Sequence, residues 1–192
     1  MRWPIPAAAV LRLLLRLSSF AALLLAGCAS LHGTPTRFDP LPPASFGGSH
    51  RAEQILNYTQ GERSMRLQAY VEISPEKMSV LATTALGQRV LQVSRDAQGL
   101  HVETALPDGA VSPDEVLNNL QLALWPLPAL QAALAGTDWT ATEPAPGTRR
   151  IAKAGLAYAE IHYANHSAWD GRWWLVNFEQ RYSLDIESKS LK

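Results

Sequence analysis

A run of nine residues in the first half of the chain alternates strictly between two kinds of side chain. One set is Met65, Leu67, Ala69, Val71 and Ile73, and the set between them is Arg66, Gln68, Tyr70 and Glu72. Because successive side chains of a strand point to opposite faces, this period of two predicts a half-buried β-strand. Residues 74–77 (Ser-Pro-Glu-Lys) predict a turn, and residues 78–82 return as its hairpin partner.

Further segments have the same strand-like character and are bounded by turn residues. They are 88–94, 100–104, 156–164, 172–178 and 182–187. Short strands with tight turns and few helices are typical of an antiparallel sheet that must curl or be covered. The expected fold class is therefore mainly β (α+β), a curved antiparallel half-barrel covered by a central helical segment.

The covering segment lies between the two groups of strands. Ser112 is a good N-cap, Pro113 suits the first helical position, and Glu115 completes a capping box. An apolar stripe at helical spacing follows, made of Val116, Leu117, Leu120, Ala123 and Leu124. Pro126 ends this helix, and residues 128–134 predict a second, short one. Two interpretations stay open: the helices cap an ordinary core, or they close a hollow that admits an apolar ligand.

The first 28 residues combine several arginines with a short apolar run that ends in the single cysteine. Residues 1–16 carry three arginines, and the apolar run 17–27 is shorter than the ~20 residues of a membrane-spanning helix. The run ends in Leu-Ala-Gly-Cys at Cys28, which resembles the lipobox of bacterial lipoproteins. That resemblance implies a signal peptide over 1–27 and an acylated Cys28. Cys28 is followed by Ala29 and Ser30 and not by an Asp. By the same resemblance, this favours delivery of the protein to the outer membrane, where it would face the periplasm.

Residues 28–48 contain four prolines and three glycines, so we expect an acylated cysteine followed by a flexible tether, with the folded domain over 49–192. Removing the leader takes away three of the 17 basic residues and leaves 14 against 17 acidic ones. This balance disfavours a nucleic-acid-binding protein. The single cysteine excludes an internal disulfide framework.

Several segments together resemble the LolB family of outer-membrane lipoproteins, which accept other lipoproteins and insert them into the membrane. The strand–loop–strand segment 81–93, the helical segment 116–136 and the closing strands 161–163 and 172–187 match in order. Leu-Gly-Gln-Arg at 86–89 and Leu-Gln-Leu-Ala-Leu-Trp-Pro at 120–126 are closer still to uncharacterised LolB-like lipoproteins that accompany aryl-polyene lipid biosynthesis. The resemblance implies a LolA/LolB-type half-barrel that binds acyl chains, with a periplasmic carrier protein as a possible donor of cargo. We expect a monomer.

If such a half-barrel encloses an apolar hollow, the inward-facing side chains of its strands and helix should contact an acyl chain. The expected lipid-binding residues are Leu67, Val71, Val80, Leu91 and Val102 from the sheet and Leu117, Leu120 and Leu124 from the helix. Leu86 and Gly87 form the expected membrane-insertion loop, since an apolar tip beside a glycine in a hairpin should be exposed. A leucine folded back on the sheet is the alternative.

Enzyme hypotheses find little support in the sequence. His162 and His166 are four residues apart, but they fall on a predicted strand end and turn, so we expect solvated residues and no metal site. No nucleophile elbow, phosphate loop or dinucleotide fingerprint occurs. We expect a binding protein without cofactor. A structural lipoprotein that scaffolds an envelope complex, and a small hydrolase acting on envelope lipids, are the competing hypotheses.

Overall fold

A computed structural model describes Phe38 and residues 40–104, 112–165 and 167–192. The leader, Cys28 and His166 therefore lie outside the described residues. Phe38–Lys192 forms one compact unit. Within the described residues, no helix combines the length and the apolar character needed to cross a membrane.

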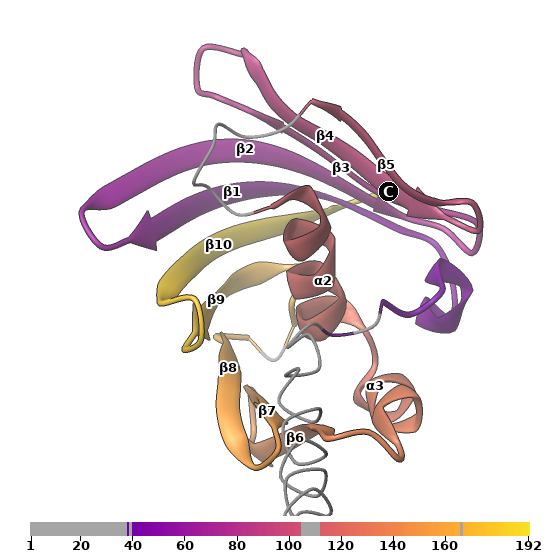
Figure 1. Cartoon of the computed structure of the whole chain (residues 1–192). Helices are drawn as coiled ribbons and strands as arrows, with labels where there is room; N and C mark the ends of the chain where they lie inside the picture. The colour runs from indigo at the N-terminus through magenta and orange to yellow at the C-terminus, as the bar shows by residue number, and fades with distance from the viewer. Residues whose placement is uncertain (1–37, 39, 105–111, 166) are drawn as a thin grey trace, which may run out of the picture. The chain divides into compact units, whose positions relative to one another are not determined.

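One antiparallel sheet of ten strands dominates this unit (Figure 1). The strands are β1 (His50–Gln60), β2 (Arg63–Ile73), β3 (Met78–Thr83), β4 (Arg89–Asp96), β5 (Gly99–Thr104), β6 (Trp139–Ala145), β7 (Thr148–Lys153), β8 (Leu156–Tyr163), β9 (Gly171–Asn177) and β10 (Tyr182–Leu191). Their order is β5-β4-β3-β2-β1-β10-β9-β8-β7-β6. Two meanders, each consecutive in sequence, thus join where β1 pairs with β10.

The period-two pattern appears in the structure as a buried and an exposed face. In β2, Leu67, Ala69, Val71 and Ile73 are buried while the residues between them are exposed. The predicted 74–77 turn is closed by reciprocal backbone hydrogen bonds between Ser74 and Lys77. All seven predicted strands are present. Strands β1, β6 and β7 were not predicted, and they complete the sheet.

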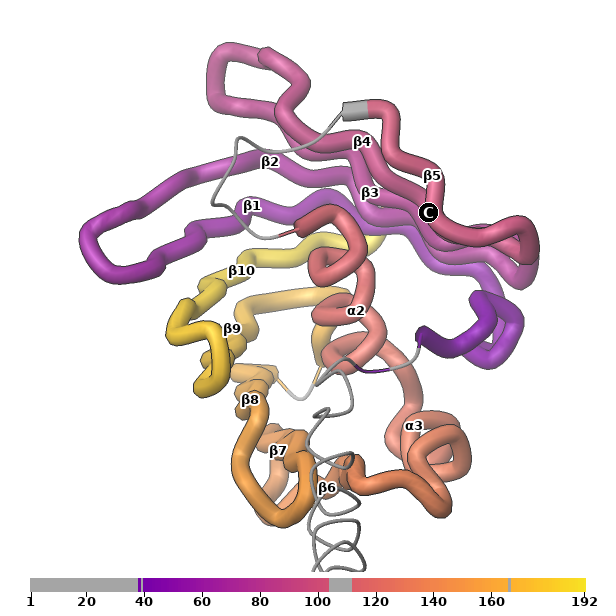
Figure 2. Tube along the Cα trace, viewed as in Figure 1, coloured from indigo at the N-terminus to yellow at the C-terminus, as the bar shows by residue number. Residues whose placement is uncertain are grey.

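Two helices connect the meanders across the concave side of the curved sheet (Figure 2). They are α2 (Pro113–Leu124) and α3 (Leu127–Leu134), and Pro126 separates them. The Ser112 hydroxyl accepts a hydrogen bond from the Glu115 amide, as predicted for the N-cap. The expected fold class, a curved antiparallel half-barrel covered by a central helical segment, is confirmed.

The prediction of a flexible tether up to residue 48 is wrong for its last part. Phe38 and Leu41 are buried in the core, and a short 3-10 helix, η2 (Pro43–Phe46), follows them. Leu41 is held by the Gln121 side chain, and the Trp125 indole donates to the Ser45 hydroxyl. The apolar residues between the prolines anchor this segment, so the domain begins at Phe38, before the expected residue 49.

Candidate functional site

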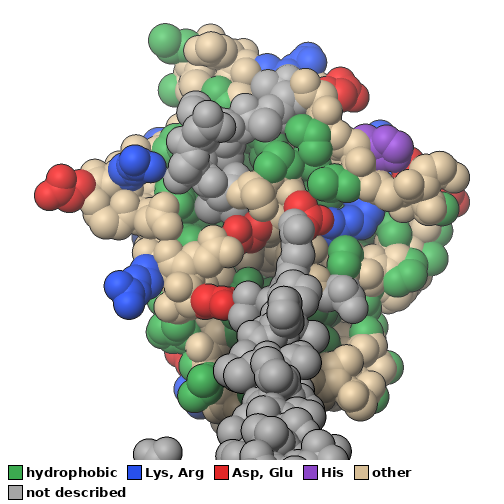
Figure 3. Space-filling view, viewed as in Figure 1, with side chains coloured by type: hydrophobic (Ala, Val, Ile, Leu, Met, Phe, Trp, Pro, Cys, Tyr) green, Lys and Arg blue, Asp and Glu red, His purple; other side chains and the backbone are tan. Residues whose placement is uncertain are grey.

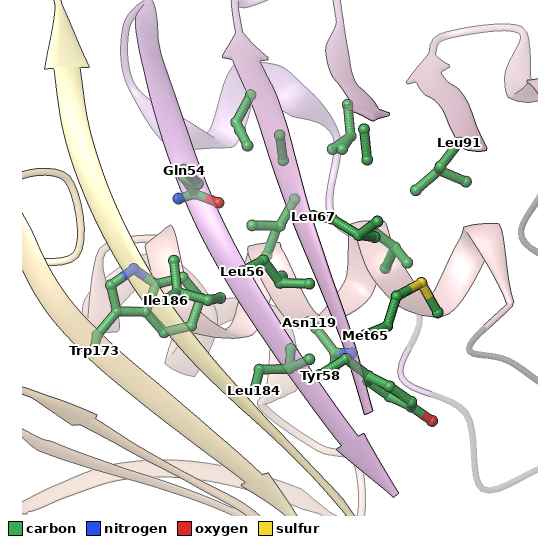
Figure 4. Close-up of a pocket in the computed structure, with 16 residues that line it drawn as sticks. Gln54, Leu56, Tyr58, Met65, Leu67, Leu91, Asn119, Trp173, Leu184 and Ile186 are labelled. Carbon is green, nitrogen blue, oxygen red and sulfur yellow. The ribbon is translucent and has the colours of Figure 1, made fainter. Parts of the chain in front are cut away.

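Within the described residues, a hollow lies between α2 and the concave side of the sheet (Figure 4). Its lining comes from β1, β2, β3, β4, β9, β10 and α2. The lining residues are Gln54, Leu56, Tyr58, Met65, Leu67, Ala69, Val71, Val80, Ala82, Leu91, Val116, Asn119, Leu120, Trp173, Leu184 and Ile186. The cavity volume is about 70 Å³, whereas one water needs roughly 10–15 Å³.

The hollow is almost wholly apolar because the inward positions of five strands carry Leu, Val, Ile, Ala or Met, and β9 contributes Trp173. Gln54 and Asn119 are the amides among its lining residues. Leu56, Met65 and Val116 are only half-buried, whereas most other lining residues are buried. These three side chains therefore mark where the hollow is most accessible to solvent.

Five of the expected lipid-binding residues lie together in this hollow: Leu67, Val71, Val80, Leu91 and Leu120. Leu117 and Leu124 do not line it and are buried in the general core instead. The helix phase explains the difference, since Val116, Asn119 and Leu120 share one face of α2 at spacings of three and four. Asn119 and Trp173 also line the hollow. The sequence analysis did not predict them, because it chose lining residues from the aliphatic side chains alone.

The placement of Val102 in the hollow was wrong. Val102 is 46% exposed and is not among the lining residues. It pairs with the buried Val93, but β5 is the edge strand of the sheet, and its described side chains from Leu100 to Glu103 are exposed on both faces. The helix α2 contacts β3 and β4. Alternation predicts the face of a residue, but it does not predict how far the covering helix extends.

The loop between β3 and β4 presents an apolar tip to solvent. Leu86 is 97% exposed. The Gly87 amide donates to the Thr84 carbonyl oxygen at 2.9 Å, and Gly87 has a φ of +78°, which favours glycine. The turn therefore holds Leu86 away from the sheet, and the alternative of a leucine folded back on the sheet does not occur.

A polar network fixes the N-terminal half of α2. The Tyr182 hydroxyl donates to Glu115 Oε1 at 2.9 Å and accepts from Asn119 Nδ2 at 2.6 Å. Burial, and then the nearby Glu115 carboxylate, raise the pKa of Tyr182 above its usual value. On the other side, Arg95 pairs with Asp114 and donates to Asn118. The Glu115 carboxylate is thus buried against Tyr182, a role that the capping-box pattern did not predict.

The C-terminal end of α2 is held by Arg149 of β7. Its Nη1 donates to the carbonyl oxygens of Leu122, Ala123 and Trp125 at 2.9, 3.2 and 2.8 Å. These carbonyls have no partner within the helix. The positive charge of Arg149 also interacts favourably with the negative end of the helix dipole. The Tyr163 hydroxyl donates to the Ala123 carbonyl at 2.7 Å, and burial raises the pKa of Tyr163 to about 12. Both ends of α2, the helix that lines one side of the hollow, are therefore held by hydrogen bonds.

The histidines form no chemical centre in the described part of the chain. His162 pairs with Glu160 at 2.8 Å and stacks on Trp174. Hydrogen bonds from Arg150 and then His162 lower the pKa of Glu160. Among the described residues, no three His, Cys, Asp or Glu side chains are grouped to hold a metal ion.

Residues 51–190 match the model of DUF3261, a protein family of unknown function. The chain belongs to the DUF3261 family. The match includes both α-helices, the whole lining of the hollow, and all ten strands except for one end residue each of β1 and β10. No curated protein matches the chain.

The solved structures that match the chain include two proteins of similar arrangement. One is described as an outer membrane lipoprotein-sorting protein domain from Vibrio parahaemolyticus, with 8% identity and a TM-score of 0.40. The other is a DUF1329 family protein from Desulfovibrio piger, with 6% identity and a TM-score of 0.37. Each alignment covers 73% of this chain and 83% of the other.

Proposed function

We propose that this protein is an envelope lipoprotein that binds the apolar chain of a lipid or lipoprotein beneath α2 and helps to place it in the outer membrane. The observation that carries the proposal is the apolar hollow that the core leaves unfilled. Binding there needs no catalysis and no cofactor. The finer elements of the proposal are a monomer that receives cargo from a periplasmic carrier and an association with aryl-polyene lipid synthesis.

The energetics favour a hydrocarbon guest. Each methylene group that leaves water for an apolar site contributes ~0.8 kcal/mol. Leu67, Val80 and Leu120 offer such a surface from two strands and the helix. A short stretch of chain therefore supplies several kcal/mol without any charged contact, which suits ligands that differ only in their headgroups.

The end of the sheet that carries Leu86 is the proposed membrane contact. In an antiparallel sheet, the turns after β1, β3, β7 and β9 all lie at the same end of the strands. Three of these turns have exposed apolar residues: Leu86, Leu156 at 76% and Phe178 at 46%. The half-buried lining residue Met65 lies in the part of β2 nearest this end. Cargo that leaves the hollow here would meet the lipid directly.

Charge at this end is compatible with a bilayer. Arg89 and Arg181 are exposed at the starts of β4 and β10, and each cation near an anionic surface contributes about 1 kcal/mol. The face in Figure 3 carries both acidic and basic side chains, with apolar ones exposed between them. Glu62 and Glu179 are exposed in the turns after β1 and β9 and offset these cations, so we propose contact through the apolar tips.

The test is the binding of a fluorescent fatty acid to the compact unit Phe38–Lys192. Ala82→Leu fills part of the hollow and should weaken binding more than tenfold, while Ala97→Leu adds the same groups at an exposed turn and should leave it unchanged. A wild-type unit that binds no fatty acid would contradict the proposal and favour the scaffold function. Turnover of an acyl ester that is lost with one Ser or His substitution would favour a hydrolase.

A further inference from the structure

Two buried polar atoms in the described part of the chain have no hydrogen-bond partner: Trp173 Nε1 and Asn119 Oδ1. Both side chains line the apolar hollow, as Figure 4 shows, Trp173 from β9 and Asn119 from α2. One atom is a donor and the other an acceptor. Buried groups of this kind are nearly always hydrogen-bonded in folded proteins, so two unpaired ones in the lining of the same hollow need a physical reason.

Neither side chain is free to turn toward another partner. The amide nitrogen of Asn119 is bonded to the Tyr182 hydroxyl, and the hydroxyl proton is directed to Glu115. The amide therefore keeps its oxygen as the unmet acceptor. Trp173 is completely buried and lies opposite Ile186 in the β9–β10 pairing, so its indole N–H cannot reach solvent. The fold holds both side chains in place at the edge of the hollow.

We infer that the natural ligand is not a bare hydrocarbon but an apolar chain with hydrogen-bonding groups inside the hollow. An N–H group donates to Asn119 Oδ1, and a carbonyl oxygen accepts from Trp173 Nε1. An acyl chain in amide linkage supplies both kinds of group, whereas an ester-linked chain supplies only acceptors. This inference rests on the proposed function and names the ligand class and the two residues that select it.

Three probes with the same twelve-carbon chain test the inference on the unit Phe38–Lys192: dodecane, methyl dodecanoate and N-methyldodecanamide. Each displaces a fluorescent fatty acid, and the ratios of their affinities are compared between the wild type and two variants. Comparing ratios removes the different hydration of the probes, because each probe is its own reference. Thermal unfolding of every variant is measured first.

Trp173→Phe keeps an aromatic ring but removes the N–H. It should lower the affinity for the ester and the amide about fivefold relative to dodecane. Asn119→Leu keeps the side-chain size but removes the acceptor. It should lower the affinity for the amide about fivefold relative to the ester. The two variants act on different atoms, so Trp173→Phe tests the inference even where Asn119→Leu does not fold.

The outcomes separate this inference from the function on which it rests. A wild type that binds none of the probes, dodecane included, contradicts the proposed function. Binding of all three probes with ratios unchanged by both variants overturns the inference alone. An equal loss for all three probes in Trp173→Phe also overturns it, because that result shows a packing role. An ordered water on both atoms, with equal affinity ratios, has the same consequence.

Discussion

Gln121 and Leu41 form a reciprocal pair of hydrogen bonds across 80 residues of sequence. The Leu41 amide donates to Gln121 Oε1 at 3.0 Å, and Gln121 Nε2 donates to the Leu41 carbonyl at 2.7 Å. Gln121 is completely buried. Its side-chain amide satisfies the backbone N–H and C=O of Leu41, as a neighbouring strand would do in a sheet. The segment before β1 is thereby part of the domain and lies against α2.

Gln121→Leu should destabilise the unit Phe38–Lys192 by about 2–4 kcal/mol, because the backbone N–H and C=O of Leu41 would both stay buried without partners. Urea unfolding measures the effect. Gln98→Leu makes the same change at an exposed turn and should alter stability by less than about 0.5 kcal/mol. Equal effects of the two variants would show that the pair contributes nothing.

Arg149→Met should destabilise the protein by about 2–4 kcal/mol, since three carbonyls at the end of α2 lose their donor. The neighbouring Arg150 points to the other face and forms an exposed ion pair with Glu160. Arg150→Met should therefore change stability by about 1 kcal/mol or less. Denaturant unfolding of both variants checks the prediction, and a larger effect of Arg150→Met would contradict it.

Alkaline pH should weaken folding through Tyr163. Its pKa is raised to about 12 in the folded state, whereas tyrosine in an unfolded chain titrates near 10. The unfolded state therefore loses its proton first, and the stability is lost progressively as pH rises from 10 to 12. Tyr163→Phe should show a smaller loss over this range. Identical slopes for the wild type and Tyr163→Phe would refute the assignment.

Leu86→Glu should reduce the binding of the unit Phe38–Lys192 to anionic liposomes several-fold, because a carboxylate at the tip of the loop would face the lipid. Leu100→Glu is the matched control. Leu100 is also exposed, at 41%, but lies at the opposite end of the strands. Co-sedimentation measures both. Equal losses would mean that the Leu86 end is not the membrane contact, and fatty-acid binding should persist in both variants.

Cys28→Ala should leave the full chain without acyl groups, because only the thiol accepts the diacylglycerol in the lipobox that residues 25–28 resemble. Mass spectrometry of the purified protein measures the modification. The variant should appear in the soluble fraction. Recovery of an acylated Cys28→Ala protein would refute the lipid anchor.

The clear periodic segments could be predicted from the sequence because burial there coincides with residue type. Strand β2 and helix α2 are examples, and they carried the fold class. Strand β1 was missed because the inward positions of its first half hold Ala52 and Gln54, which show no apolar alternation. Strand β7 was missed for a related reason, since its inward position 149 is an arginine that caps α2.

The hollow could be predicted only in part. Leu67, Val71 and Val80 follow from the strand pattern, but whether a buried side chain touches empty space or a neighbour depends on the curvature of the sheet and the position of α2. Two predicted lining residues show this: Leu117 is buried in a filled part of the core, and Val102 lies on an edge strand beyond the reach of α2. That Asn119 and Trp173 line the hollow depends on the same placement of α2 and the sheet, so it could not be predicted from the sequence.

The pairing of β1 with β10 at the centre of the sheet has a consequence for biosynthesis. As the chain emerges, each meander assembles from neighbouring hairpins, but the inner edge of β1 stays open until the final ten-residue strand has been made. Such an open edge invites association with other chains. A chaperone that shields this edge of β1 until β10 has formed would therefore aid the folding of this chain.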